Sequence, residues 1–357
     1  MKLHIAYTVS DEFTHFLSVS MTSILKNSNL ADEFIFYILG SDITPENKRK
    51  IESLKSIKNF DIEWITVYNK DFKDIKAGVN MASNYRIKIS TLKPNLDKIL
   101  FLDADMIFTS SLDKLYSMEL KDNYIAAVVD PGVKIQYEYT IKHKEKFPDR
   151  RFNTGLMLIN LKKWRSDNIE EKLIEGLRWY SKHYYMWPDQ NVMNMVFKDH
   201  ILELPPKYNA CPLLAQRGFY EEEGVMETAL DAPLVIHYCG TPKPWECFDI
   251  RTCKEFNTFQ NKASINNNLL WDDIFWAYAK LTPYYEAFIA KYIDYRLKET
   301  QISAEMVKDI VNYKHNKFKY WQYKLLCNFV FGKNKYKYFE KKKFYKEKLH
   351  CVKQFIK

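Results

Sequence analysis

Glycine is scarce in this 357-residue chain, with nine residues, and no Gly-x-Gly-x-x-Gly or lysine-bearing glycine-rich loop occurs. This disfavours dinucleotide-binding oxidoreductases and P-loop NTPases, because both hold phosphates with such loops. No apolar run approaches the roughly 20 residues that a membrane-spanning helix needs. No charged and then apolar leader opens the chain, since residues 1–9 have the pattern of a β-strand, and we expect a cytoplasmic protein.

Cysteine is also sparse and irregularly placed. The six cysteines show neither CxxC pairs nor the spacing of a zinc site; they stand at positions 211, 239, 247, 253, 327 and 351. Reduced thiols in a cytoplasmic protein are the interpretation that this pattern favours.

Acidic residues are scarce at one end of the chain. Residues 314–357 hold fourteen lysines and two glutamates, a net charge of +12, whereas the rest of the chain carries −3. Aromatic residues alternate with these lysines, and Phe318, Trp321, Leu325 and Phe329 can share one helical face. This tail suits an anionic membrane surface, a nucleic acid or a solvated disordered end.

The order of the predicted elements indicates an α/β fold. Strands are predicted at Leu3–Val9, Glu33–Leu39 and Phe60–Val67, with helical segments between them, which is typical of a mostly parallel sheet. Thr44 is expected to cap the helix that begins at Pro45. Further segments are a helix at 83–92, strands at 123–129, about 155–160 and 234–238, a polar linker at 257–268, and helices within 269–297 and 304–312.

One apolar stretch, Ile99–Phe108, is interrupted by two acids, Asp103 and Asp105. If the strand persists through them, both carboxylates point to the same face. Two like charges at the end of a buried strand need compensation, and a divalent cation with hard oxygen ligands would supply it. The alternative is a strand followed by an acidic turn.

Three further motifs follow in order: FNTGLMLINLKKW from residue 152, PDQNVMN from residue 188, in which Asp189 is expected to cap a helix, and HYCGTPKPW from residue 237. Together with LFLDADM, they resemble glycosyltransferase family 8, and most closely the bacterial galactosyl- and glucosyltransferases that build lipooligosaccharide. The resemblance covers residues 3–248. It implies a GT-A fold, a UDP-sugar donor, retention of anomeric configuration and Mn²⁺, with Mg²⁺ as the alternative.

The resemblance also implies roles for individual residues. It assigns the metal to Asp103, Asp105 and His237, and the donor diphosphate to Gly240 and Lys243. The first loop would hold the base through Thr8, Ser10 and Phe13, although Ser10 stands where the family usually has an aspartate. The remaining donor-binding positions are Arg86, Ala104, Asp130, Asn153, Thr154, Gly155, Asp189 and Gln190.

Asp189 and Gln190 are the positions assigned to catalysis. Gln190 matches the family's candidate nucleophile, but an amide oxygen is a poor nucleophile. We therefore favour front-side displacement, with Gln190 stabilising an oxocarbenium-like transition state, over double displacement.

The resemblance implies a UDP-hexose donor, with galactose or glucose as the sugar, and a lipooligosaccharide or other surface-glycan acceptor. For such an acceptor we expect the tail to attach the protein to the inner face of the membrane rather than to nucleic acid. A non-catalytic sugar-nucleotide-binding or scaffolding protein is the alternative. The expected domains are a GT-A catalytic domain at 1–255, a helical extension at 256–313 and the basic, aromatic tail at 314–357.

Overall fold

The structure is a computed structural model, and it describes residues 1–68, 72, 75, 81–216, 232–240, 243–244, 271–311, 313–329 and 338–346. The chain divides into two compact units, Met1–Ile289 and Ala290–Lys357. Within the described ranges, all strands belong to the first unit.

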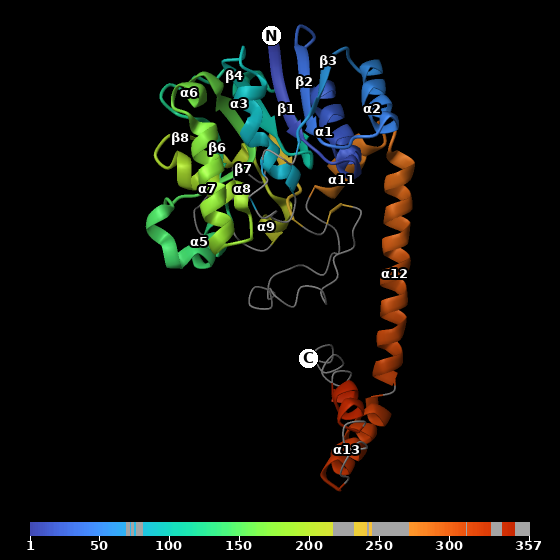
Figure 1. The fold of residues 1–357 in the computed structure, drawn as a ribbon. Helices are drawn as coiled ribbons and strands as arrows, with labels where there is room; N and C mark the ends of the chain where they lie inside the picture. Colours follow the sequence, from blue (N-terminus) through green and yellow to red (C-terminus); the bar gives the residue numbers. More distant parts are fainter. Residues whose placement is uncertain are drawn as a thin grey trace. The chain divides into compact units, whose positions relative to one another are not determined.

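A seven-stranded sheet forms the centre of the first unit (Figure 1). Its spatial order is β3-β2-β1-β4-β7-β6-β8, and four of the six neighbouring pairs are parallel. Strand β7 is the exception, because it runs antiparallel to both β4 and β6. The bounds are β1 (Lys2–Thr8), β2 (Glu33–Gly40), β3 (Asp61–Thr66), β4 (Lys98–Leu102), β6 (Ile125–Val129), β7 (Phe152–Asn160) and β8 (Ile201–Leu204). The predicted α/β architecture with a mostly parallel sheet is confirmed.

Helices cover the central strands, whose apolar side chains are buried on both faces. Residues 99–102 of β4 and 156–159 of β7 have no exposed surface, as expected of strands that lie between two layers. Helix α1 contacts β5, α2 and α11, whereas α8 contacts β7 and α7 (Figure 1). The helices longer than six residues in this unit are α1 (Thr14–Asn27), α2 (Pro45–Glu52), α5 (Val133–Thr140), α7 (Ile169–His183), α8 (Pro188–Phe197) and α11 (Asp272–Ala279).

Short helical segments connect these elements. The α-helical ones are α3 (Ile89–Leu92), α4 (Asp113–Tyr116), α6 (Leu161–Ser166) and α9 (Pro212–Gln216). The 3₁₀ segments are η1 (Asp11–Phe13), η2 (Ser53–Ser56), η4 (Met81–Lys88), η5 (Ile141–Lys146) and η6 (Pro206–Tyr208). The helix predicted at 83–92 is therefore a 3₁₀ segment, η4, that continues directly into α3.

The two predicted helix caps have different outcomes. Thr44 caps α2, because its Oγ1 accepts a hydrogen bond from the Asn47 N–H at 3.3 Å and Pro45 follows at the first helical position. The prediction that Asp189 caps α8 is wrong. Pro188 takes the first helical position, which suits its fixed φ and missing N–H, so Trp187 becomes the cap and Asp189 lies inside the first turn.

The stretch Ile99–Phe108 does not form one continuous strand. Strand β4 ends at Leu102, and β5 (Met106–Phe108) leaves the large sheet to pair antiparallel with β9 (Val235–His237). Residues 103–105 form the turn between them. The side-chain alternation expected through the two acids therefore does not apply, and their positions depend on the turn.

Beyond the sheets the described chain is helical. Helix α12 (Tyr285–Val311) begins at the end of the first unit, and the second unit contains α13 (Tyr313–Phe329) and a helix at 338–346. On α13, Phe318, Trp321 and Leu325 are each more than half exposed. Within the described helices, none combines the length and apolar character needed to cross a bilayer. The predicted linker at 257–268 lies outside the described residues, and the three-domain division stays a prediction.

Candidate active site

Three side chains that the sequence separates widely converge at the turn after β4. His237 Nε2 lies 3.3 Å from Asp105 Oδ1 and 3.8 Å from Asp103 Oδ2. One ligand atom from each of the three residues lies within 4.8 Å of the other two. His237 is 3% exposed, so the imidazole approaches the carboxylates from inside the protein.

The pairing of β5 with β9 brings the histidine to the acids. His237 lies opposite Met106 in this two-stranded sheet, directly after the turn that contains Asp103 and Asp105. The Tyr238 N–H also donates to the Asp105 carbonyl at 2.9 Å. Backbone pairing therefore fixes a residue from far downstream beside the acidic turn.

The backbone of β7 closes the other side of the site. A Cβ atom on Gly155 would lie 2.6 Å from His237 Cε1 and 2.7 Å from Asp103 Oδ2, closer than such atoms pack. The Asp103 N–H donates to the Gly155 carbonyl at 2.6 Å. Glycine is required here, because only a residue without a side chain lets the strand approach both ligands.

Two cations accompany the acids in this structure. The buried Arg86 guanidinium donates to Asp103 Oδ1 at 2.7 Å and lies 3.6 Å from Asp189 Oδ2. Lys243 Nζ donates to Asp105 Oδ2 at 2.6 Å and to the Tyr238 carbonyl at 2.6 Å. Three carboxylates thus face two permanent cations. The cluster keeps a negative excess when the imidazole is neutral, and a bound cation would offset it.

The charges shift the protonation of the three converging residues. Burial opposes the charged imidazolium, but the Asp105 carboxylate outweighs burial and raises the pKa of His237 to about 9. Burial raises the pKa of Asp103, although Arg86 opposes that effect. The pKa of Asp105 is lowered, because Lys243 and His237 outweigh its burial. In the absence of a metal, the imidazole therefore holds a proton that an incoming ion must displace.

The predicted sugar-binding residues form one hydrogen-bonded network. Asp130 Oδ2 accepts from Asn153 Nδ2 at 3.1 Å and from Gln190 Nε2 at 2.8 Å. Gln190 Oε1 accepts the Thr154 N–H at 3.2 Å. The other oxygen of Asp130 accepts the Gly132 N–H at 2.7 Å, so this residue both fixes a turn and holds the network.

The predicted base and diphosphate residues lie at the same edge of the sheet. Strands β1 and β4 are parallel with Tyr7 opposite Leu102, so Thr8 ends β1 beside the acidic turn. Ser10 precedes η1, and Phe13 at the end of η1 stacks on Phe16 with ring centroids 5.4 Å apart. Lys243 Nζ lies 5.5 Å from the centroid of the same Phe16 ring.

Two small residues complete the predicted set. Gly240 has a φ of +74°, a left-handed conformation that glycine adopts without strain, and it lies in the segment between His237 and Lys243. Ala104 lies between the two acids and is 7% exposed. The structure therefore places most predicted site residues at the acidic turn, the carboxyl end of β1, the start of β7 and α8, or the segment after β9. Arg86 on η4 and Asp130 after β6 join this group through hydrogen bonds, Arg86 to Asp103 and Asp130 to Asn153 and Gln190.

The structure also contains site residues that the sequence patterns did not identify. Asn209 Oδ1 lies 2.9 Å from His237 Nδ1, and Asn209 Nδ2 donates to Asn153 Oδ1 at 2.9 Å. Cys211 and Cys239 each place a sulfur within 4.8 Å of a His237 nitrogen and of each other. Spacing could not reveal these residues, because 28 positions separate the cysteines and Asn209 belongs to none of the four motifs.

The donor set fits a hard divalent cation. Two carboxylates and an imidazole that offers a lone pair once its Nε2 proton has left suit Mn²⁺ or Mg²⁺, and Gly155 keeps the space between Asp103 and His237 open. Asn209 supports the histidine from its other side. Its Oδ1 accepts a hydrogen bond from Nδ1, so that nitrogen keeps its proton and Nε2, which faces the acids, is the nitrogen that can bind the metal.

The chain is also similar to known proteins. Residues 4–248 match the model of Glycosyl transferase family 8. A lipopolysaccharide 1,2-glucosyltransferase from Escherichia coli is 30% identical over 251 residues, which cover 68% of this chain and 73% of that protein. General stress protein A from Bacillus subtilis is 25% identical over 287 residues, which cover 73% of this chain and 97% of that protein.

Solved structures show the same fold. The galactosyltransferase LgtC, solved in complex with donor and acceptor sugar analogs, aligns with a TM-score of 0.62 at 24% identity, over 79% of this chain and 96% of that chain. The predicted GT-A fold is thereby confirmed, and at this identity the likeness concerns the fold alone.

Proposed function

The chain belongs to glycosyltransferase family 8 and is a glycosyltransferase, and from this premise we propose that it transfers galactose or glucose from a UDP-sugar, with retention of configuration, to a lipooligosaccharide or other surface glycan. The convergence of Asp103, Asp105 and His237 carries the proposal. The name of the related lipopolysaccharide 1,2-glucosyltransferase supports a hexose and a surface-glycan acceptor.

Asp103, Asp105 and His237 would hold Mn²⁺, or Mg²⁺ in its place. The ion would act as a Lewis acid that offsets the charge developing on the leaving diphosphate. Lys243 places a positive charge next to Asp105, and Gly240 allows the backbone to approach phosphate oxygens. In this proposal Lys243 exchanges its carboxylate partner for the diphosphate when the donor binds.

The network around Asp130 would hold the sugar. Arg86, buried between Asp103 and Asp189, orients both acids, and Asn153 and Gln190 share Asp130 as their acceptor. Thr154 and Gly155 contribute backbone to the same surface. The uracil would lie against the loop formed by Thr8, Ser10 and Phe13, where Phe13 offers an exposed aromatic face.

Gln190 supports front-side displacement. Its Nε2 donates to Asp130 and its Oε1 accepts the Thr154 N–H, so both ends of the amide are held. A restrained amide suits electrostatic stabilisation of an oxocarbenium-like transition state better than covalent attack. The acceptor hydroxyl would then attack on the face of the leaving group, and the departing phosphate would take its proton.

The substitution Asp103→Asn in the full-length protein tests this function. We expect Mn²⁺-dependent hydrolysis of UDP-galactose or UDP-glucose to fall at least about 100-fold, since a metal ligand is lost. The exposed Asp199→Asn is the matched control and should retain full turnover. Thermal unfolding of both variants shows whether the lost Arg86 contact affects folding.

Two results would contradict the proposal. Retained Mn²⁺-dependent turnover in Asp103→Asn would exclude the metal assignment. Thermal shift with a panel of UDP-sugars measures donor binding by the unmodified protein. If the protein binds a UDP-sugar but shows no metal-dependent hydrolysis, it is a non-catalytic sugar-nucleotide-binding protein instead.

The C-terminal tail extends the proposal to the membrane. Phe318, Trp321 and Leu325 are exposed on α13, and lysines accompany them along the helix. Such a surface inserts aromatic side chains at the headgroup level while lysines bind anionic lipids. We propose that the tail attaches the enzyme peripherally to the inner face of the membrane, where a lipid-linked acceptor is available.

A further inference from the structure

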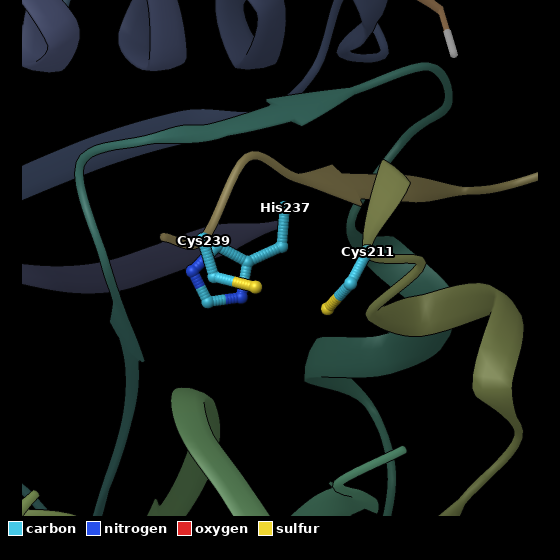
Figure 2. Close-up of side chains that lie close together, drawn as sticks. All are labelled: Cys211, His237 and Cys239. Atoms are coloured by element: carbon cyan, nitrogen blue, oxygen red, sulfur yellow. The ribbon is translucent and has the colours of Figure 1, made fainter. Parts of the chain in front are cut away.

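A second group of metal ligands shares His237 with the acidic site. Cys211, His237 and Cys239 each place one ligand atom within 4.8 Å of the other two. Figure 2 shows both sulfur atoms directed toward the space beside the imidazole ring. Cys211 is fully buried, and neither cysteine forms a disulfide.

Backbone hydrogen bonds hold these ligands in place. The His237 N–H donates to the Ala210 carbonyl at 2.8 Å, and the Ala210 N–H donates to the Val235 carbonyl at 2.9 Å. The residue before Cys211 is therefore attached to β9 itself, and Cys239 follows β9 by two residues. The three ligands come from two segments that are already fixed to one another.

The ligand chemistry differs from that of the acidic site. Two thiolates and an imidazole form a soft donor set that selects Zn²⁺, Cd²⁺ or Co²⁺ over Mn²⁺ and Mg²⁺. In a tetrahedral zinc site two thiolate sulfurs are about 3.8 Å apart, as follows from Zn–S bonds of about 2.3 Å. Ligand atoms within 4.8 Å of each other therefore need to move by about 1 Å or less to bind one ion.

We propose that Cys211, His237 and Cys239 bind a thiophilic divalent cation of the zinc class, and that this ion competes for His237 with the hard cation of the acidic site. Three protein ligands leave a fourth position for water or a small anion.

The competition follows from the two nitrogens of His237. Nε2 faces Asp103 and Asp105, whereas Nδ1 faces Asn209. A neutral imidazole has one lone pair and one N–H. Binding of the soft ion through Nδ1 would break the Asn209 contact and leave the imidazole proton on Nε2, where it occupies the lone pair that the acidic site needs. The soft-metal site itself does not depend on the proposed function, whereas the competition rests on the hard-metal site of that proposed function.

Co²⁺ absorption tests the binding directly. We expect the reduced full-length protein, kept under a phosphine reductant, to show a thiolate-to-cobalt charge-transfer band at one equivalent of Co²⁺, and Zn²⁺ to bleach it. Cys211→Ser and Cys239→Ser should each weaken Co²⁺ binding at least about tenfold, since each removes a ligand. Cys351→Ser, which changes a cysteine outside the cluster, is the matched control and should retain the band.

Absence of the band in the unmodified protein, or its persistence in Cys211→Ser, would overturn the proposal. Circular dichroism of Cys211→Ser separates ligand loss from misfolding. If the buried serine prevents folding, Cys239→Ser gives the same test.

Competition is measured by the Mn²⁺ electron paramagnetic resonance signal, which reports free ion and needs no enzymatic activity. Zn²⁺ should release bound Mn²⁺ from the unmodified protein at lower concentration than from Cys211→Ser, by about tenfold or more. Equal release from both proteins would mean that Zn²⁺ acts at Asp103 and Asp105, and would overturn the competition. These readings stay valid if the proposed transfer reaction fails.

Discussion

At the scale of single residues, Asn209 connects the two halves of the site. It holds His237 Nδ1 at 2.9 Å and donates to Asn153 at 2.9 Å, and Asn153 in turn donates to Asp130. The proposed metal ligands and the proposed sugar network therefore share one amide. A residue of this kind positions the imidazole without touching the metal.

Replacing Asn209 by alanine should weaken Mn²⁺ binding about 10- to 100-fold, because His237 loses the contact that fixes its tautomer. Isothermal titration of Mn²⁺ measures this change. Asn209→Asp keeps an acceptor for Nδ1, and we expect it to recover part of the affinity. Asn123→Ala, before the amino end of β6, is the control. Equal Mn²⁺ affinity in Asn209→Ala and the control would exclude the positioning role.

Protons compete with the proposed metal for His237, so the affinity for Mn²⁺ should depend on pH. The raised pKa of about 9 means that the metal-free imidazole is protonated at neutral pH, and one proton leaves for each ion bound. The apparent affinity for Mn²⁺ should therefore rise about tenfold per pH unit between pH 6.5 and 8.5. Titrations at several pH values test this, and an affinity independent of pH over that range would contradict it.

The motifs predicted that Asp103, Asp105 and His237 form one group, and the structure brings them together, but the motifs did not predict what surrounds them. The sequence did not indicate that Arg86 would contact Asp103 or that Lys243 would contact Asp105, because these contacts depend on side-chain positions around a turn. The spacing of Cys211 to the other cysteines fits no metal-site pattern. Its relation to His237 arises only when the Ala210 segment pairs with β9.

At the scale of elements, β7 passes so close to the site that its backbone forms one wall. Gly155→Ala would place a methyl group against His237 and Asp103, and such overpacking costs about 1–3 kcal/mol of folding stability. We expect Mn²⁺ affinity and turnover to fall together, as measured by titration and UDP-sugar hydrolysis.

Gly176→Ala is the matched control for this change. Its Cβ would lie 2.7 Å from Val192 between α7 and α8, so it adds similar crowding without touching a proposed metal ligand. We expect urea unfolding to show a comparable loss in the free energy of unfolding, whereas the Mn²⁺ affinity should stay unchanged. If Gly155→Ala kept full affinity, the close approach of β7 would have no role in the site.

Strand and helix positions followed well from apolar periodicity and turn residues, as β1, β2, β3 and α2 show. The apolar pattern gave the wrong strand at Ile99–Phe108. Apolar residues on both sides of the two acids fit one long buried strand as well as they fit two short ones. Only the partner decides between these, and β5 finds its partner, β9, more than 120 residues downstream. Local periodicity carries no information about such a pairing.

At the scale of the whole molecule, positive charge is concentrated in residues 314–357, whereas the rest of the chain is slightly acidic. Each lysine near an anionic bilayer contributes about 1 kcal/mol at moderate salt, so fourteen lysines would suffice for the proposed reversible attachment. The exposed aromatic side chains on α13 would add apolar contact.

Deletion of residues 314–357 should abolish cosedimentation with phosphatidylserine-containing vesicles while UDP-sugar hydrolysis persists. Trp321→Ser in the full chain should weaken binding, whereas Leu30→Ser, at a fully exposed leucine of the first unit, should not. Salt should weaken attachment, because it screens the lysines. Binding that survives the deletion, or that RNA displaces more readily than salt does, would contradict the membrane assignment.

The proposed metal ligands come from two segments that lie far apart in the sequence, and this has a consequence for synthesis on the ribosome. A nascent chain carries both aspartates and Arg86 long before His237 and Lys243 emerge together, 132 and 138 residues after Asp105. Until then the acidic turn has neither its imidazole nor its lysine, and β5 has no strand to pair with. Under the proposed metal assignment, loading of the ion would therefore be a late event, and a pulse of radioactive manganese would mark the chains whose synthesis has passed that point.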